Sequence, residues 1–207
     1  MTEHYFTASP STDDARFPLR VVLAGKEREL VSSASVFSGR SLDKATAVLL
    51  DRLDHLTAVP AGAKILDLGC GWGPIALSAA LLHPDAQVWA VDVSERARSL
   101  TAHNAQLLGC ANVRVLAPEE VEESVRFDVI WSNPPIRIGK EALHDLLLLW
   151  LGRLQPTGTA AMVVGKNLGA DSLARWIAEQ FPQRSVAKAA SAKGFRILEV
   201  SPEGDLS

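Results

Sequence analysis

The stretch that decides the fold is KILDLGCGWGP (64–74), in which a short apolar run leads directly into three alternating glycines. An apolar run of this length predicts a buried strand, and Pro74 suits the first turn of a helix. A glycine-rich turn between a strand and a helix lets the backbone approach a ligand without an intervening Cβ atom. The stretch therefore predicts a strand, a ligand-binding loop and a helix in succession.

Downstream of this loop, short apolar runs alternate with helical segments, which is the pattern of a parallel sheet covered on both faces. Ser94 is placed to cap one helix that runs to Gly109, and Asp171 to cap another that runs to Phe181. Only a short turn separates the last two runs, so we expect an antiparallel hairpin at the sheet edge. The prediction is a Rossmann-like, doubly wound α/β sheet of seven mostly parallel strands, at 64–68, 87–92, 113–116, 127–132, 159–165, 184–189 and 195–200.

The chain before the sheet predicts a small β-hairpin and one helix. Two runs of strand character, FPLRVVLAG (17–25) and ERELVSS (27–33), meet at a tight turn. Apolar residues then recur every three or four positions from Leu42 to Leu56, which lays one stripe along a helix that Pro60 ends.

Length and composition fit one domain. The 207 residues are 47% hydrophobic, which is enough for a single core. The two cysteines, Cys70 and Cys110, cannot make a disulfide framework, and their spacing does not suit a metal. The longest apolar run, 146–151, is far too short to cross a bilayer. We expect a cytoplasmic, metal-free monomer, with a polar arm, the hairpin and the helix in residues 1–60 packed on one globular ligand-binding domain in residues 61–207.

The acid that closes the second strand narrows the choice of ligand. Asp92 lies 19 positions after Gly73, a spacing at which a carboxylate reaches the two hydroxyls of a ribose. A dinucleotide fingerprint would place another glycine where this chain has Pro74, and Asp67 would repel a pyrophosphate. The same carboxylate suits a ligand with an ammonium and a sulfonium group. These features favour S-adenosylmethionine over NAD, and a merely structural tight turn is the other alternative.

A second motif, SNPPI (132–136), begins at the end of the strand 127–132. Its two prolines remove two backbone donors and leave carbonyl oxygens facing out at the carboxyl end of the sheet. If Asn133 Oδ1 and the Pro134 carbonyl both accept from an NH₂ group, that nitrogen is held with its lone pair toward a methyl donor. No general base is needed first, because the amine can lose its proton after attack. An ordinary turn is the alternative, but the position at a strand end favours a site.

With both motifs, the chain resembles class I methyltransferases that carry an N/D-P-P-Y/F motif. Within them it is similar to the small-subunit ribosomal RNA guanine-N2 methyltransferases of the methyltransferase small domain family. The likeness extends to HYF (4–6), VFS (36–38), LDK (42–44), Gly139 and FRILEV (195–200). The resemblance implies an S-adenosylmethionine site made of Asp67, Gly69, Cys70, Gly71, Gly73, Asp92, Val93, Leu116, Ala117 and Asn133, a catalytic motif of Asn133, Pro134 and Pro135, and substrate contacts from Phe37, Lys44 and Ile136.

Two positions depart from the family pattern. The aromatic residue that usually follows the two prolines and stacks on a flipped base is Ile136 here, which loses a stacking contribution of ~1 to 3 kcal/mol. Where many members have Asn or Asp after the third strand, this chain has Ala117 and Pro118. Adenine recognition is therefore expected to fall to backbone amides or to Leu116.

RNA contacts are expected from a local basic patch, because a formal net charge of −3 and a pI near 6.0 give no global basic field. Longer family members carry a duplicated domain before the catalytic one, so RNA must be positioned differently here. Arg137, Lys140 and Lys166 follow strand ends on the site side, and Lys193 and Arg196 lie near the last hairpin. A solvated surface charge is the alternative for each.

The sequence thus predicts S-adenosylmethionine-dependent methyl transfer to an exocyclic amine. Guanine N2 of small-subunit ribosomal RNA is the expected acceptor, and that RNA or the small subunit is the expected partner. A protein glutamine amide is an alternative acceptor, because the NPP motif serves its NH₂ group equally well. A non-catalytic module that binds the cofactor or RNA is a further alternative, against which Asp67, Asp92 and Asn133 together argue.

Overall fold

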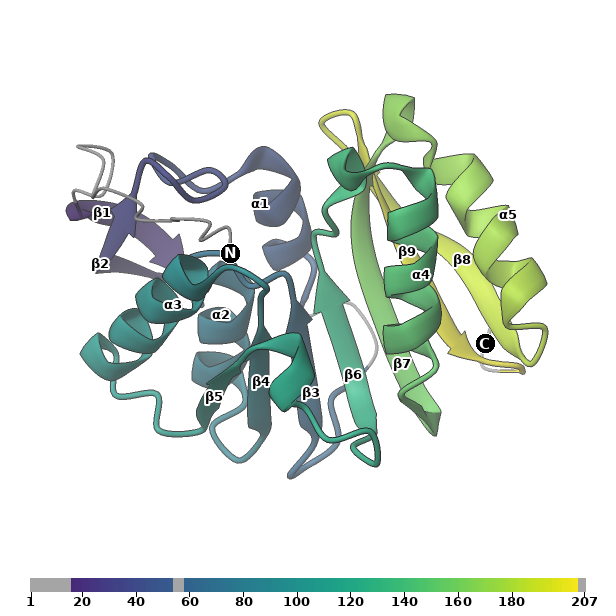
Figure 1. The fold of residues 1–207 in the computed structure, drawn as a ribbon, viewed down its shortest axis with the longest axis horizontal. Coiled ribbons are helices and arrows are strands. Elements are labelled where there is room, and N and C mark those ends of the chain that lie inside the picture. The colour runs from purple at the N-terminus through teal and green to yellow at the C-terminus, as the bar shows by residue number, and fades with distance from the viewer. Residues whose placement is uncertain (1–15, 54–57, 205–207) are drawn as a thin grey trace, which may run out of the picture.

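The computed structural model describes residues 16–53 and 58–204. Its main sheet consists of β3 (Lys64–Leu68), β4 (Gln87–Val91), β5 (Val113–Leu116), β6 (Phe127–Ser132), β7 (Leu154–Gly165), β8 (Arg184–Ala192) and β9 (Phe195–Pro202). The strand order is β5-β4-β3-β6-β7-β9-β8 (Figure 1). The first five strands of this order pair in parallel, whereas β9 is antiparallel to both β7 and β8. The predicted α/β class, with its antiparallel C-terminal hairpin, is confirmed.

Helices cover both faces of the sheet (Figure 1). One apolar cluster joins the sheet to α1 (Lys44–Leu50), α2 (Pro74–Leu82) and α3 (Glu95–Leu107). A second cluster, on the opposite face, joins it to α4 (Lys140–Leu151) and α5 (Ala170–Gln180). Burial of these two apolar layers is the main force that holds the fold together.

The strand order reverses between β3 and β6, because the chain first builds β4 and β5 on one side of β3 and then returns to its other side. Leu68 and Ser132, the last residues of β3 and β6, are paired in register. The Ser132 hydroxyl donates a hydrogen bond to the Leu68 carbonyl oxygen at 2.7 Å. The glycine loop and the NPP turn therefore leave the sheet side by side, at the point where doubly wound sheets bind their ligands.

The predicted N-terminal hairpin is present as β1 (Arg16–Leu23) and β2 (Lys26–Ser33), paired antiparallel along their length. Its attachment to the main body is polar as well as apolar. Asn104 on α3 donates to the Val31 carbonyl oxygen at 2.9 Å and accepts from the Val31 amide at 2.8 Å. The predicted polar arm, residues 1–15, lies outside the described residues.

The first helix is shorter than its apolar stripe predicted. It begins after Asp43, whose carboxylate accepts hydrogen bonds from the amides of Ala45 and Thr46. At its other end, a bond from the Arg52 amide to the Leu49 carbonyl tightens the last turn into 3₁₀ geometry. Leu42 thus precedes the helix, and Leu56 lies outside the described residues.

The expected cap of the last helix is wrong. Gly169, with a φ of 86°, occupies the N-cap of α5, and Asp171 lies within the first turn. The Asp171 carboxylate instead pairs with Lys188 at 2.5 Å and with Arg196, both on the C-terminal hairpin. Two cations on the neighbouring strands attract the carboxylate more strongly than the helix amides do.

Three strands are longer than predicted, and β9 is one of them because it continues to Pro202, which pairs with Arg184. β7 begins at Leu154, because this residue pairs with Phe127 ahead of a register shift in the sheet. β8 continues to Ala192, where Lys193 and Gly194, both with positive φ, form a two-residue hairpin turn.

Candidate active site

A pocket opens where β3 and β6 end. Its walls come from the segment before α1, the beginning of α1, the glycine loop, the first residues of α2 and the NPP turn. The lining residues are Phe37, Ser38, Asp43, Thr46, Gly69, Cys70, Gly71, Trp72, Pro74, Ile75 and Asn133.

The glycines of the loop have two different roles. All three have left-handed backbone conformations, with φ of 79° at Gly69, 59° at Gly71 and 98° at Gly73. A Cβ on Gly69 or Gly71 would have no heavy atom within 4 Å, whereas a Cβ on Gly73 would meet the Thr101 side chain at 3.1 Å. Gly73 therefore lets the loop pack on α3. The other two leave open space for a ligand beside the backbone.

Asp92 holds the glycine loop in place. Its Oδ2 accepts from the Gly71 amide at 3.0 Å, and its Oδ1 accepts from the Ser94 amide at 2.8 Å. The amides of Gly69 and Cys70 add bonds to the Val91 carbonyl oxygen at 2.8 and 3.1 Å. Each carboxylate oxygen of Asp92 keeps a further lone pair, so it can still accept from a ribose hydroxyl.

Asp67 is a buried acid below the glycine loop. Its Oδ2 accepts from the Ala76 amide of α2 at 2.9 Å, while its Oδ1 has no partner among the described residues. Burial raises the pKa of this carboxyl to about 8, the Ala76 hydrogen bond opposes the rise, and the Asp92 carboxylate adds to it. Asp67 is not among the residues that line the pocket, so its contact with a positively charged ligand stays a prediction.

Replacing Asp67 with asparagine is expected to change how stability depends on pH. The folded protein holds a proton on Asp67 between the ordinary pKa of 3.8 and about 8, whereas the unfolded chain does not. This contribution is fully present below pH 3.8 and is lost as the pH rises toward 8, by up to ~1.4 kcal/mol per pH unit. Urea unfolding at pH 5, 7 and 9 measures the free energy of unfolding of both proteins. The value for Asp67→Asn should rise relative to that of the wild type at each step to higher pH. Parallel curves would contradict the raised pKa.

Cys70 and Trp72 pack inside the loop rather than offering reactive groups. Both are buried, and burial raises the pKa of the Cys70 thiol well above its usual value. The Thr101 hydroxyl lies 3.5 Å from the Cys70 sulfur, and Asn104 donates to the Trp72 carbonyl oxygen at 2.9 Å. A neutral, enclosed thiol is a poor nucleophile.

The orientation of the Asn133 side chain is set by two residues of the α1 segment. Its Nδ2 donates to Asp43 Oδ2 and to Thr46 Oγ1, each at 3.0 Å. An ionised carboxylate only accepts hydrogen bonds, so the NH₂ end of the amide must face Asp43. No described residue donates to Asn133 Oδ1, and this oxygen remains an available acceptor at the pocket wall.

The sequence predicted that the carbonyl oxygens of the two prolines face out of the loop. In the structure, both accept hydrogen bonds from amides of the same turn. The Pro134 carbonyl oxygen accepts from the Ile136 amide at 2.8 Å, and that of Pro135 accepts from the Ile138 amide at 3.1 Å. Pro135, with φ of −75° and ψ of 70°, forms an inverse γ-turn that closes the first of these bonds. The Pro134 oxygen therefore keeps only its second lone pair for a substrate.

The two apolar residues expected to contact substrate lie in different surroundings. Ile136 begins the 3₁₀ turn η4 (Ile136–Ile138) and packs against the core under α4 and α5. Phe37 lines the pocket, and 66% of its surface is exposed. The aromatic ring at this site thus comes from the segment before α1.

Three residues predicted for the cofactor site, Val93, Leu116 and Ala117, do not line this pocket. Val93 is 82% exposed, Leu116 is half-buried, and Ala117 is buried. The Ala117 amide donates to the Glu120 carboxylate at 2.6 Å, which closes the short helix η3 (Pro118–Glu120). The Ala117 amide hydrogen is thus bound within the protein, and recognition of adenine by another backbone amide or by Leu116 stays a prediction.

The basic candidates divide into exposed and engaged groups. Arg196 is held by Asp171, as described above. The Lys166 amide, at the start of η5 (Lys166–Leu168), donates to the Gly194 carbonyl oxygen at 2.9 Å, which places Lys166 beside the β8–β9 turn. The exposed members are Lys44, Arg137, Lys140, Lys166 and Lys193.

Both Asp43 and Thr46 line the pocket, but the sequence gave Asp43 only as part of the 37–44 segment that borders the site in similar proteins, and it gave Thr46 no role. A helix-capping signal existed at Asp43, because it precedes an apolar stripe. A cap, however, does not indicate a contact with a residue 90 positions away. Thr46 gave no signal, since a threonine inside a helix is ordinarily a solvent-facing residue.

Neither metals nor membranes find support in the described part of the chain. Residues 16–53 and 58–204 hold no group of three or more His, Cys, Asp or Glu side chains arranged for a metal ion. None of the described helices combines the length and the apolar character needed to cross a bilayer.

The sheet order and the open glycine loop are those of a class I methyltransferase, whose cofactor is S-adenosylmethionine. The model of the methyltransferase small domain family matches residues 27–199. The chain belongs to this family, which confirms the resemblance drawn from its two motifs.

Curated relatives agree in family and differ in named activity. The uncharacterized protein YbxB of Bacillus subtilis is 33% identical over 202 residues, which cover 96% of this chain and 98% of that protein. The ribosomal RNA large subunit methyltransferase G of Pseudomonas syringae is 34% identical over 78% of this chain and 45% of its own length. The release factor glutamine methyltransferase of Bordetella pertussis is 39% identical over 63% of this chain and 47% of its own. The chain therefore spans about half the length of these two named enzymes.

Solved structures show the same fold. The 16S rRNA N2 methyltransferase RsmC of T. thermophilus, determined with AdoMet and guanosine, superposes with a TM-score of 0.75 at 22% identity. The match covers 91% of this chain and 51% of that one. A methyltransferase from Pyrococcus furiosus gives a TM-score of 0.63 and covers 83% of this chain and 86% of its own.

Proposed function

We propose that this protein transfers a methyl group from S-adenosylmethionine to an exocyclic amino group of a base in ribosomal RNA, with guanine N2 of the small subunit as the specific acceptor. The observation that carries the proposal is the Asn133 amide, whose NH₂ end is bound and whose oxygen is available. An amine acceptor needs such a hydrogen-bond acceptor beside it. The ribosomal RNA enzymes among the relatives support the choice of acceptor.

The residues of the pocket have different roles in the proposed reaction. Bound S-adenosylmethionine supplies an electrophilic methyl group. The open faces of Gly69 and Gly71 accommodate the cofactor beside the loop, and the Asp67 carboxyl lies buried beneath that loop. Asn133 Oδ1 accepts a hydrogen bond from the acceptor NH₂, which aims the nitrogen lone pair and stabilises the charge that develops on nitrogen. The amine then releases its proton to solvent, so no buried base is required.

Phe37 is suited to hold the target base. The ring is exposed at the mouth of the same pocket as Asn133, and a base must leave its stack for its amino group to reach that asparagine. Stacking on an aromatic ring contributes ~1 to 3 kcal/mol per base. Phe37 thus supplies from before α1 the aromatic surface that Ile136 lacks.

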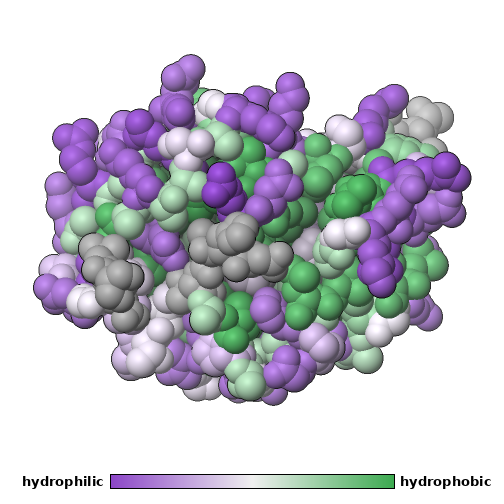
Figure 2. Space-filling view, turned by 180° about the vertical axis from the view of Figure 1, so that it is seen from behind, coloured by the Kyte–Doolittle hydropathy of each residue, from purple (hydrophilic) through white to green (hydrophobic). Residues whose placement is uncertain are grey.

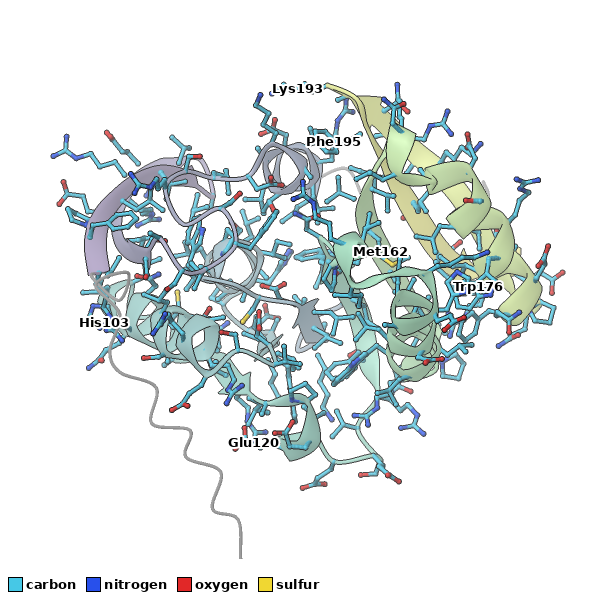
Figure 3. The ribbon with its side chains drawn as sticks, turned by 45° about the horizontal axis from the view of Figure 1, so that its top comes forward. His103, Glu120, Met162, Trp176, Lys193 and Phe195 are labelled. Carbon is cyan, nitrogen blue, oxygen red and sulfur yellow. The ribbon has the colours of Figure 1, made fainter. Side chains whose placement is uncertain are left out.

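Charge is unevenly distributed along the carboxyl edge of the sheet. The segments after β6 and β7 and the β8–β9 turn carry the cations, whereas those after β4 and β5 carry acids (Asp92, Glu119, Glu120). Figure 3 shows Lys193 at the tip of the hairpin and Glu120 on the opposite side of that view. Figure 2 shows hydrophilic side chains along the top of the molecule, the side on which α1 and the β8–β9 turn lie in Figure 1. RNA phosphates would approach over the β6–β7 side.

Removing one of these cations should weaken the salt dependence of RNA binding. Arg137 follows the end of β6, and Arg126 precedes its beginning. These two exposed arginines therefore lie near opposite ends of the same strand. For Arg137→Ala we expect the slope of log K against log salt to fall by about 1, because one phosphate contact is lost. Arg126→Ala is the control and should leave the slope unchanged. Filter binding of ribosomal RNA between 50 and 200 mM salt, roughly the range in which such contacts matter, measures both slopes. Equal slopes for Arg137→Ala and Arg126→Ala would show that Arg137 does not contact RNA phosphates.

The proposed activity is tested with S-adenosylmethionine that carries an isotopically labelled methyl group. The purified protein is incubated with naked ribosomal RNA, with each ribosomal subunit and with a protein extract that lacks RNA. Label in RNA that digests to N2-methylguanosine supports the proposal. Label in another methylated base corrects the acceptor atom, and the absence of label from every RNA sample rejects the proposal.

A glutamine amide is the second candidate acceptor, and one observation favours it. The Bordetella pertussis relative that is 39% identical carries glutamine methyltransferase in its name. The pocket offers its acceptor oxygen to any NH₂ group, since Asn133 Oδ1 does not distinguish a base amine from an amide. Label that travels with protein in the same experiment would select this candidate.

A further inference from the structure

We propose that Asp43 is a positioning residue for the reaction, because it decides which end of the Asn133 amide faces the acceptor amine. The inference rests on the proposed function, in that it assumes an NH₂ acceptor. It concerns a residue of the N-terminal segment, far in sequence from the NPP motif. Asp43 is half-buried at the pocket wall, where its carboxylate meets Asn133.

The two ends of an asparagine amide have almost the same shape and opposite hydrogen-bonding character. With the oxygen toward the pocket, Asn133 accepts from the acceptor amine. With the amide turned over, its NH₂ group would face another NH₂ group, and no hydrogen bond could hold the nitrogen. The choice between the two states therefore decides whether the site can hold its acceptor, and it must come from the other partners of Asn133.

Those partners act together. Asp43 Oδ2 accepts from Asn133 Nδ2, and the Thr46 hydroxyl oxygen accepts from the same nitrogen. Turning the amide over would bring its oxygen against the carboxylate oxygen at about the same 3.0 Å separation. Two acceptors facing each other at that distance repel, and Asp43 Oδ2 would lose the hydrogen bond from Asn133 Nδ2.

Asp43 is itself held firmly. The same Oδ2 atom accepts from the Ala45 amide at 2.8 Å and the Thr46 amide at 3.0 Å, which caps α1. Ala45 and Thr46 are buried, so the helix start cannot shift without disturbing the core. The Oδ2 atom of Asp43 thus both caps α1 and orients the side-chain amide of Asn133.

Two substitutions at Asp43 separate its cap role from its positioning role. All three hydrogen bonds reach a single oxygen, so Asp43→Asn, with Oδ1 in that place, should preserve them. Asp43→Ser keeps an N-cap of similar strength, but its hydroxyl is one bond shorter and cannot reach Asn133 in the same way. We expect kcat to stay within about threefold of wild type for Asp43→Asn and to fall ~10- to 100-fold for Asp43→Ser.

Three further measurements test that Asp43 acts through Asn133. The Kd for S-adenosylmethionine and the melting temperature should be similar for wild type, Asp43→Asn and Asp43→Ser. Adding Asp43→Ser to Asn133→Ala should not slow the reaction further. A fall in kcat for Asp43→Ser that persists in the Asn133→Ala background, or that follows a loss of melting temperature, would overturn the proposal.

The acceptor used is the one that the labelling experiment identifies, RNA or protein, because both offer an NH₂ group. If wild type labels neither, the proposed function fails, and the orientation is tested by nitrogen-15 NMR of the Asn133 side chain. The side-chain amide protons should be protected from solvent exchange in wild type and Asp43→Asn and unprotected in Asp43→Ser. Equal exchange in all three proteins would reject the positioning role independently of any activity.

Discussion

Replacing Asn133 with alanine should reduce kcat for methyl transfer ~100- to 1,000-fold and leave the Kd for S-adenosylmethionine within about twofold. The size is that expected when one preorganised polar group is removed from a site of charge development. Nδ2 of Asn133 is held by Asp43 and Thr46, whereas no described residue donates to the side-chain oxygen, so the loss falls on the acceptor amine. Single-turnover kinetics with labelled cofactor measure kcat, and calorimetry measures Kd.

The matched control for this change is Asn112→Ala. Asn112 is also half-buried and also donates two hydrogen bonds through its amide, to the carbonyl oxygens of His83 and Ala86 at 3.3 and 3.1 Å. Both substitutions should lower stability by a similar amount, about 1 kcal/mol. Only Asn133→Ala should lower kcat. If Asn133→Ala turned over as fast as the control, the acceptor role would be wrong, and a non-catalytic binding module would regain support.

A second large effect is expected for Gly69→Ala, which should weaken S-adenosylmethionine binding ~100-fold. The added methyl group would project into open space beside the loop, where we place the cofactor. A hundredfold loss corresponds to about 2.7 kcal/mol of binding free energy. Equilibrium dialysis with labelled cofactor would measure it.

Gly25→Ala serves as the matched control for the backbone. Gly25, in the β1–β2 turn, has a φ of 71° against 79° for Gly69, and a Cβ at either position would have no heavy atom within 4 Å. The two alanines should therefore cost similar stability, about 1 kcal/mol, through the left-handed backbone alone. Equal cofactor binding by both variants would mean that the cofactor does not lie against Gly69.

The elements of the fold were largely predictable from local patterns. The apolar runs, the glycine loop and the spacing from Gly73 to Asp92 depend on near neighbours in the chain, and they led to the sheet, its C-terminal hairpin and the cofactor. The same local reasoning misjudged where elements end. β7 starts at Leu154, because its pairing with Phe127 on another strand decides that boundary.

The tertiary structure decided where side chains point and which residues they contact. Ile136 and Phe37 are both apolar residues of the predicted site, yet one packs on the core and the other is exposed in the pocket. Asp171 has the pattern of a helix cap, but the folded chain brings it two cations from the C-terminal hairpin.

The sequence by itself determined that this protein has a glycine loop after one strand and an NPP turn after another, because strand periodicity and turn residues are patterns of near neighbours in the chain. Only the tertiary structure placed the two strand ends side by side, because Leu68 and Ser132 are far apart in the sequence. Only the tertiary structure decided that Asp43 orients Asn133. These residues are 90 positions apart, and a hydrogen bond between them forms only because α1 packs against the sheet at the point where the strand order reverses.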